Sequence, residues 1–373
     1  MTKRRYLLLI VAILFLSPLR ASAVSNGEIK DLKQEIDNLK TKVELLEAQN
    51  EDTTSRIGNL VDISGYADGE FNLTDNQAAN ARSEFRLHHL SLFFSKQLAE
   101  QWRLFSEVEF EDAPKIEPSE QTYPGEIFVE VFTLEYSHNR YVNFRLGRFL
   151  NPAGIWNVEH YPPFVLTQEQ PTLVTQLIFP HTNDGLQFYG SHYQGGVTTD
   201  YLFYVSNGSG ENPGHGDINT DKSWGADLGF KLPFLSDAEI GFSYDRENRD
   251  ENDNKVKILG ADARLAWQDL KFQGEYAKRY TRLVAGTTEQ TIGWYSQLTY
   301  DWRKWTVGYR YDWYDPDQRE NNNRMTTNTV ALNYHFTPNV VGKIEHHFVK
   351  DEGASDVHYT KTLFSVAVYL GGN

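Results

Sequence analysis

The connections between strand-like segments are sorted by length, and this sorting constrains the fold more than any other feature of the chain. Tight turns are predicted near residues 98–99, 137–139, 195–196, 233–236, 268–269, 301–302 and 337–339. They alternate with longer polar links near residues 74–80, 112–125, 151–184, 207–222, 246–254, 281–289, 315–324 and 351–356. A barrel that crosses a membrane has short turns on one side and long loops on the other, whereas a soluble sandwich has no reason to sort its connections. The sequence therefore predicts an all-β transmembrane barrel of about sixteen antiparallel strands.

The segments between these connections alternate large apolar residues with small or charged ones. In the segment 305–313, Trp305, Val307 and Tyr309 fall on one face, and Gly308 and Arg310 on the other. Many segments run to about ten residues, which suits a tilted membrane strand better than the usual globular strand of about five or six. The hydrophobic fraction is only 40% and the mean hydropathy is -0.55, and no stretch after residue 23 approaches the ~18 apolar residues of a spanning helix. These properties favour a barrel over a helical membrane protein.

Residues 1–23 have the pattern of a secretory signal peptide. Lys3, Arg4 and Arg5 precede an apolar run over residues 6–16, and the small residues at 21–23 supply a cleavage pattern. The alternative, a single membrane anchor, needs about 20 apolar residues, which this run does not have. The chain contains no cysteine, so neither a lipidated cysteine nor a disulfide is expected. Export to the bacterial outer membrane is predicted.

A different periodicity precedes the barrel, which is expected over residues 60–373. Mostly apolar residues at alternating spacings of three and four form a heptad seam from Ile29 to Leu60, which predicts a periplasmic coiled coil over residues 24–59. The candidate oligomerisation residues are Ile29, Leu32, Ile36, Leu39, Val43, Leu46 and Asn50. If Ile29 is an a position, Glu35 faces Lys40 and Lys42 faces Glu47 across parallel helices. The pattern predicts a parallel homo-oligomer. The alternative is one amphipathic helix lying on its own barrel.

The third long connection, 151–184, is rich in aromatic residues and proline and poor in charge. Its residues of this kind include Trp156, Tyr161, Pro162, Pro163, Phe164, Pro171 and Phe179. That content suits a packed plug that narrows the barrel from within, and Glu159 and Glu169 are candidates to face a basic wall there. The alternative is an outward-facing loop that binds a partner at the cell surface.

The segment Gly147-Arg148-Phe149-Leu150-Asn151-Pro152-Ala153-Gly154, followed by this long connection, resembles the passage into the third loop of bacterial general porins. More loosely, it resembles the phosphate-selective porin O and P family, and the resemblance covers the chain from about residue 60 to its end. It implies a trimeric barrel of sixteen strands with the third loop in the lumen and selectivity set by lumen side chains. The chain departs from these families in its last residues, Gly371-Gly372-Asn373, which include no terminal aromatic. The third loop also lacks an Arg/Lys cluster, so phosphate selectivity is not implied.

Charges of both signs are predicted on the lumen face. The pore-lining candidates are Glu107, Glu109, Glu111, Arg145, Glu159, Glu169, Arg303, Lys304 and Arg310. Acidic residues on one wall opposite basic residues on another would create a transverse field that acts on ions and on the dipoles of small solutes. The alternative is that these charges pair along the wall and only hold the shape of the barrel.

The overall charge and the motifs exclude several classes of function. Without residues 1–23, 32 Lys and Arg oppose 51 Asp and Glu, a net charge of -19, which argues against nucleic-acid binding. No nucleophile motif or cofactor motif is present, so no catalytic residue, cofactor or metal ligand is assigned. His88-His89 and His346-His347 look like metal pairs, but adjacent strand residues point to opposite faces, so neither pair is expected to hold one ion.

The predicted function is passive diffusion of ions and small hydrophilic solutes through a barrel surrounded by outer-membrane lipid and lipopolysaccharide. The alternative is a structural or adhesive outer-membrane protein tethered through its coiled coil, or a barrel sheath for a partner protein.

Overall fold

The computed structural model describes residues 61–75, 83–114, 125–208, 219–233, 238–250, 252–353 and 356–371. The predicted signal peptide over residues 1–23 and the predicted coiled coil over residues 24–59, with its seam from Ile29 to Leu60, lie outside these residues. Both stay predictions.

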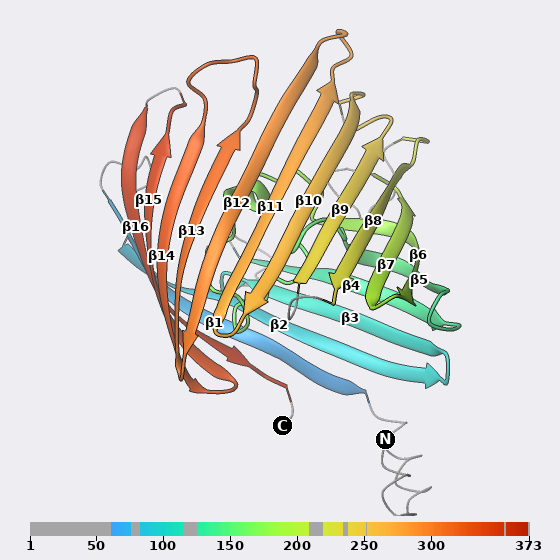
Figure 1. The fold of residues 1–373 in the computed structure, drawn as a ribbon, viewed down its shortest axis with the longest axis horizontal. Helices are drawn as coiled ribbons and strands as arrows, with labels where there is room; N and C mark the ends of the chain where they lie inside the picture. The colour runs from blue at the N-terminus through green and yellow to red at the C-terminus, as the bar shows by residue number, and fades with distance from the viewer. Residues whose placement is uncertain are drawn as a thin grey trace, which may run out of the picture. The chain divides into compact units, whose positions relative to one another are not determined.

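In the described part of the chain, sixteen antiparallel strands close into one barrel (Figure 1). The strands are β1 Asp62–Thr74, β2 Ser83–Ala99, β3 Trp102–Glu111, β4 Glu126–Ser137, β5 Asn143–Leu150, β6 Thr182–Gln194, β7 Val197–Ser206, β8 Ser223–Leu232, β9 Ala238–Glu247, β10 Lys255–Trp267, β11 Leu270–Arg282, β12 Thr288–Trp302, β13 Trp305–Asp315, β14 Met325–Thr337, β15 Val340–Asp351 and β16 Val357–Tyr369. Each strand pairs with its neighbours in sequence, and β16 closes the ring against β1, with Tyr369 opposite Tyr66. The predicted strand number and pairing direction are confirmed.

Short turns and long loops alternate along the whole barrel, as predicted. Several connections are shifted by a few residues from the sequence-based expectation, and two of these shifts affect predicted site residues or the third loop. Trp302 pairs with Trp305, so the turn between β12 and β13 consists of Arg303 and Lys304. The third long connection is residues 151–181, hereafter L3, because Thr182 to Asp184 continue the ladder of β6 with β5.

The outward face of the barrel is apolar and exposed, whereas the inward face is polar. On β13 the outward positions Trp305, Val307 and Tyr309 are exposed, and the inward positions Arg310 and Asp312 are buried. Aromatic rings also meet near the short-turn edge, with Trp102 and Tyr136 centroids 4.8 Å apart and Trp305 and Tyr334 centroids 4.6 Å apart. Such a broad apolar surface with aromatic residues at its edge suits contact with lipid.

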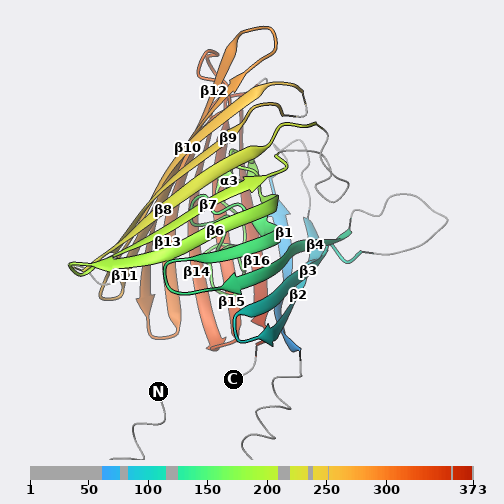
Figure 2. The ribbon, with the colours of Figure 1, turned by 90° about the vertical axis from the view of Figure 1, so that its right-hand side faces the viewer.

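The main apolar core of the described residues lies inside the ring of strands, where L3 packs against the wall. Trp156, Leu173, Val174 and Ile178 of L3 are buried together with inward residues of four strands, namely Val256, Ile258, Ala277, Tyr295 and Tyr314. Figure 2 shows the single helical turn α3 (Thr172–Thr175) of L3 within the barrel. Among the described residues, no helix is long and apolar enough to cross a membrane. L3 is therefore a packed element of the barrel interior.

Two wall glycines let L3 approach closely. A Cβ added at Gly293 of β12 would lie 2.6 Å from Cδ1 of Ile178, and a Cβ added at Gly308 of β13 would overlap the side chain of Leu166. Any larger residue at these positions would push L3 away from the wall.

Candidate functional site

Charged and polar side chains of the barrel wall form hydrogen bonds with backbone groups of L3. The backbone N–H of Trp156 donates to Glu275 (2.8 Å), that of Thr172 donates to Asp312 (3.0 Å), and that of Gln168 donates to Glu345. Lys343 donates to the backbone carbonyl of Val165 (2.8 Å), and Asn333 donates to the carbonyl of Leu166 (2.9 Å). A buried loop needs partners for its backbone polar groups, and charged partners make the stronger hydrogen bonds. The inward charges at this level of the barrel thus hold L3.

Arg310, a predicted pore-lining residue, is one of these anchors. Its side chain is only 1% exposed and donates to Asp312 (2.9 Å), to the Thr167 hydroxyl (2.5 Å) and to the carbonyl of Glu169 (3.0 Å). Its guanidinium also lies 5.8 Å from the ring centroid of Trp156. Arg310 faces inward as predicted, but L3 covers it.

The two acidic residues of L3 each meet a wall cation, although neither partner is among the pore-lining candidates named from the sequence. Glu159 lies 2.8 Å from Arg264 and its side chain is 61% exposed, and Glu169 pairs with Lys361. Removal from water disfavours the charged form of Glu169 and by itself would raise its pKa. The ammonium of Lys361, with the nearby His347 and Arg310, has the larger opposite effect and holds the pKa of Glu169 below its ordinary value.

The predicted acidic wall also faces inward, but most of it is buried. Glu107 and Glu109 of β3 are 0% and 3% exposed, and Glu107 accepts from Ser91 (2.6 Å) and Tyr161 (3.4 Å). Glu111, at the end of β3, is partly exposed.

The remaining predicted basic residues divide between the wall and a turn. Arg145 of β5 pairs with Glu135 (2.6 Å) and donates to Gln187 (2.9 Å). Arg303 and Lys304 form an exposed turn, so their predicted place on a strand is wrong, although Arg303 still lines a cavity beside L3. The ladder continues two residues past the expected turn, and this moves both cations to the edge of the barrel.

Two cavities adjoin L3. The first, of about 410 Å³, lies between L3 and the inward faces of β10 to β14, and its charged lining residues are Glu159, Arg264, Lys271, Asp301 and Arg303. The second, of about 280 Å³, is lined on its polar side by Arg103, Glu135, Arg145 and Gln187. Arg264 and Lys271 are not among the pore-lining candidates named from the sequence, because nothing in the sequence shows which part of the wall L3 leaves uncovered.

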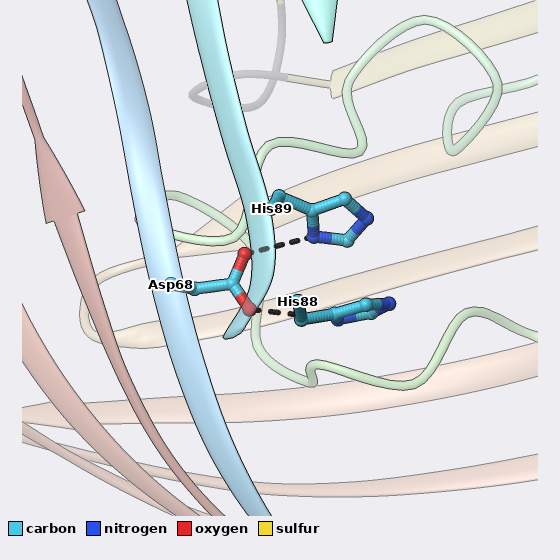
Figure 3. Close-up of side chains that lie close together, drawn as sticks. All are labelled: Asp68, His88 and His89. Carbon is cyan, nitrogen blue, oxygen red and sulfur yellow. Dashed lines mark hydrogen bonds and ion pairs between the residues drawn. The ribbon is translucent and has the colours of Figure 1, made fainter. Parts of the chain in front are cut away.

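The prediction for His88 and His89 is wrong. Asp68 of β1 stands opposite His89, and the next residue, Gly69, stands opposite Leu87, so His88 is the extra residue of a β-bulge. Both imidazoles consequently lie on the same side of β2 and approach one carboxylate, with Nδ1 of His89 2.8 Å and Nδ1 of His88 3.5 Å from Asp68 (Figure 3). His346 and His347 do alternate as predicted, since His347 is buried against Thr329 while His346 contacts Thr362 on the other face.

A second convergence of histidines and carboxylates joins L3 to the wall. Glu130 of β4 lies beside His160 and His181 of L3, and buried Glu107 and Glu109 are close to Glu130. These residues are far apart in sequence, and neither His160 nor His181 sits in a motif, so no sequence pattern could have grouped them.

A closed sixteen-stranded barrel with an apolar outside, a polar wall and a long loop folded within belongs to the class of porin-like outer-membrane barrels. The chain belongs to the Gram-negative porin family, whose sequence profile matches residues 47–354. The predicted resemblance to porins is confirmed, and the family and the fold together support a place in the outer membrane.

The match to a curated relative is distant. An uncharacterized protein of Aquifex aeolicus (strain VF5) is 29% identical over 243 residues, which are 58% of this chain and 52% of that protein. The chain thus matches about half the length of this curated relative.

Several solved porin structures share the fold. Salmonella typhi OmpF in complex with daunomycin has a TM-score of 0.61 at 14% identity, covering 84% of this chain and 98% of that chain. The anion-selective porin from Comamonas acidovorans has a TM-score of 0.59 at 13% identity, covering 83% of this chain and 99% of that chain. The trimer form of in-vitro folded OmpT from Vibrio cholerae has a TM-score of 0.57 at 12% identity, covering 83% of this chain and 99% of that chain. At such identities the likeness concerns the fold alone.

Proposed function

We propose that the protein is a non-enzymatic porin through which ions and small hydrophilic solutes diffuse passively, along a water-filled path that L3 narrows. The observation that carries this proposal is the anchoring of L3 to inward charges of the barrel wall beside a polar cavity of about 410 Å³. A loop held by buried charged hydrogen bonds keeps a fixed place in the lumen, as a constriction requires.

The residues proposed to meet the passing solute are those that L3 leaves in contact with water. On the first cavity these are Glu159, Arg264, Lys271, Asp301 and Arg303, which carry both signs of charge. Glu159 and Asp301 are partly neutralised by wall cations, since Lys271 lies 2.7 Å from Asp301 and Arg264 lies 2.8 Å from Glu159. Opposed charges across a narrow passage favour polar solutes that can align with the field.

The purified barrel should conduct ions in a planar bilayer and admit small sugars into liposomes. Conduction without exclusion of larger sugars would argue against a constriction. A closed bilayer after verified insertion would favour the structural, adhesive or sheath alternatives.

We also propose a homo-oligomer, with three subunits preferred. The heptad seam from Ile29 to Leu60 and the trimer form of Vibrio cholerae OmpT support this assembly. Outer-membrane lipid and lipopolysaccharide are the proposed partners of the apolar outer face.

A further inference from the structure

Three side chains converge where L3 meets β4. Oε1 of Glu130 lies 2.7 Å from Nε2 of His181 and 3.4 Å from Nε2 of His160. Glu130 is 3% exposed and His160 is 8% exposed. One ligand atom from each of the three residues falls within 4.8 Å of the others. The cluster is therefore compact and mostly shielded from water.

Asn157 determines which nitrogen of each histidine carries a proton. Its Nδ2 donates to the backbone carbonyls of Asn151 (2.6 Å) and His181 (3.0 Å), so its Oδ1 is an acceptor, and it lies 2.9 Å from Nδ1 of His181. Nδ1 of His160 faces the backbone carbonyl of Asn157 at 3.3 Å. Both Nδ1 atoms must therefore donate. In a neutral imidazole the lone pair is then on Nε2, which in both residues points at Glu130.

Two nitrogen lone pairs that point at a carboxylate are repelled by it unless a cation or a proton lies between them. The surroundings add more negative charge, because carboxylate oxygens of Glu107, Glu109 and Glu130 also lie within 4.8 Å of one another and all three residues are buried. Oε2 of Glu130 and Nε2 of His160 have no hydrogen-bond partner within the described residues. The site needs either a metal ion or extra protons.

We propose that Glu130, His160 and His181 bind a divalent transition-metal ion of the zinc class, which ties L3 to the barrel wall. Two imidazole nitrogens and one carboxylate oxygen form a usual ligand set for Zn²⁺, whereas Ca²⁺ and Mg²⁺ prefer oxygen ligands only. Asn157 acts as a positioning residue, since histidine ligands commonly donate their other ring nitrogen to a fixed oxygen. The proposal does not depend on what the barrel conducts.

Protons are the competing explanation. Burial lowers the pKa of His160, but contact with Glu130 and the charges of the neighbouring glutamates reverse this and raise it to about 9. An imidazolium at His160 would partly balance the carboxylates at neutral pH, and only a direct measurement of metal separates the two explanations.

The test is metal binding by the full-length protein in detergent after removal of metal with a chelator. Titration with Zn²⁺ alone should give a stoichiometry of one ion per chain, with no comparable binding of Mg²⁺ or Ca²⁺. His181→Gln keeps a donor toward Glu130 and should weaken Zn²⁺ binding at least about tenfold, and Asn157→Ala should weaken it about 10- to 100-fold.

The neighbouring cluster of Asp68, His88 and His89 supplies a matched control. His88→Gln should leave the affinity for Zn²⁺ unchanged, because His88 contacts Asp68 and Glu70 rather than the glutamates beside Glu130. X-ray absorption of the Zn²⁺-loaded wild type should show imidazole nitrogen ligands, which keeps the test valid if a variant fails to fold. Absence of Zn²⁺ binding by the wild type would assign the site to protons and overturn the proposal. Loss of binding in H88Q but not in H181Q would place the metal at Asp68 and overturn it as well.

Discussion

At the scale of single residues, inward charges of this barrel have two different roles that sequence cannot separate. Arg310 and Glu159 were both predicted to line the pore, and both face inward. Arg310 is buried against the backbone of L3, whereas the Glu159 side chain is 61% exposed beside a cavity. The difference depends on the path of L3, which no local pattern encodes.

Replacing Arg310 with Ala should strongly destabilise the barrel. The change leaves Asp312 buried without its cation and frees two backbone carbonyls of L3. Breaking a buried pair of this kind costs about 3–5 kcal/mol. The free energy of unfolding in denaturant, measured in detergent, checks this. Arg303→Ala in the exposed β12–β13 turn is the control and should change stability by less than about 0.5 kcal/mol. Equal effects of the two changes would contradict an anchoring role.

Acidification should loosen L3 at its contact with Lys361. The pKa of Glu169 is lowered in the folded state, so this pair contributes stability above the ordinary carboxyl value of 4.5 and loses it as the pH falls below that value. Current fluctuations of single channels should therefore increase on acidification below pH 4.5. Glu169→Gln should show larger fluctuations already at neutral pH. Identical pH profiles for wild type and E169Q would rule out this pair as the cause.

At the scale of elements, alternation and loop sorting were sufficient to predict the strands, their direction and the long third connection. The predictions are wrong where a local irregularity changes the direction of a side chain or the length of a strand. A bulge turns His88 to the same side as His89, and two extra ladder residues move Arg303 and Lys304 into a turn. The contacts between L3 and the wall join residues far apart in sequence, as for Thr167 and Arg310, and could not be derived from periodicity.

The close approach of L3 to β13 should make Gly308 intolerant of substitution. A Cβ at this position would overlap Leu166, so Gly308→Ala should displace L3 and cost about 1–3 kcal/mol of overpacking. Thermal unfolding and single-channel conductance both report the change. Gly229→Ala, on the inward face of β8, is the control, because its added Cβ would lie 3.6 Å from Glu239, an ordinary contact. If G229A and G308A behave alike, L3 does not press on the wall at this point.

At the scale of the whole molecule, the barrel and the predicted coiled coil are expected to have separate cores. Changing Ile36 and Leu39 to Asp places charge in the heptad seam and should weaken association while leaving the barrel folded. Cross-linking in membranes should then shift from oligomers toward monomers, with unchanged heat-dependent migration of the barrel. Cross-linking that yields only monomers from the wild type would contradict the homo-oligomer.

The central claim is that L3 narrows an open path through the barrel, and single-channel conductance with and without L3 tests it most directly. Deleting residues 154–176 removes most of the segment packed in the lumen and leaves β5 and β6 joined by a short loop. The wild type should conduct, and the shortened protein, once its insertion is verified, should conduct more because the obstruction is gone. A wild type that never conducts, or a deletion that leaves the conductance unchanged, would contradict the account.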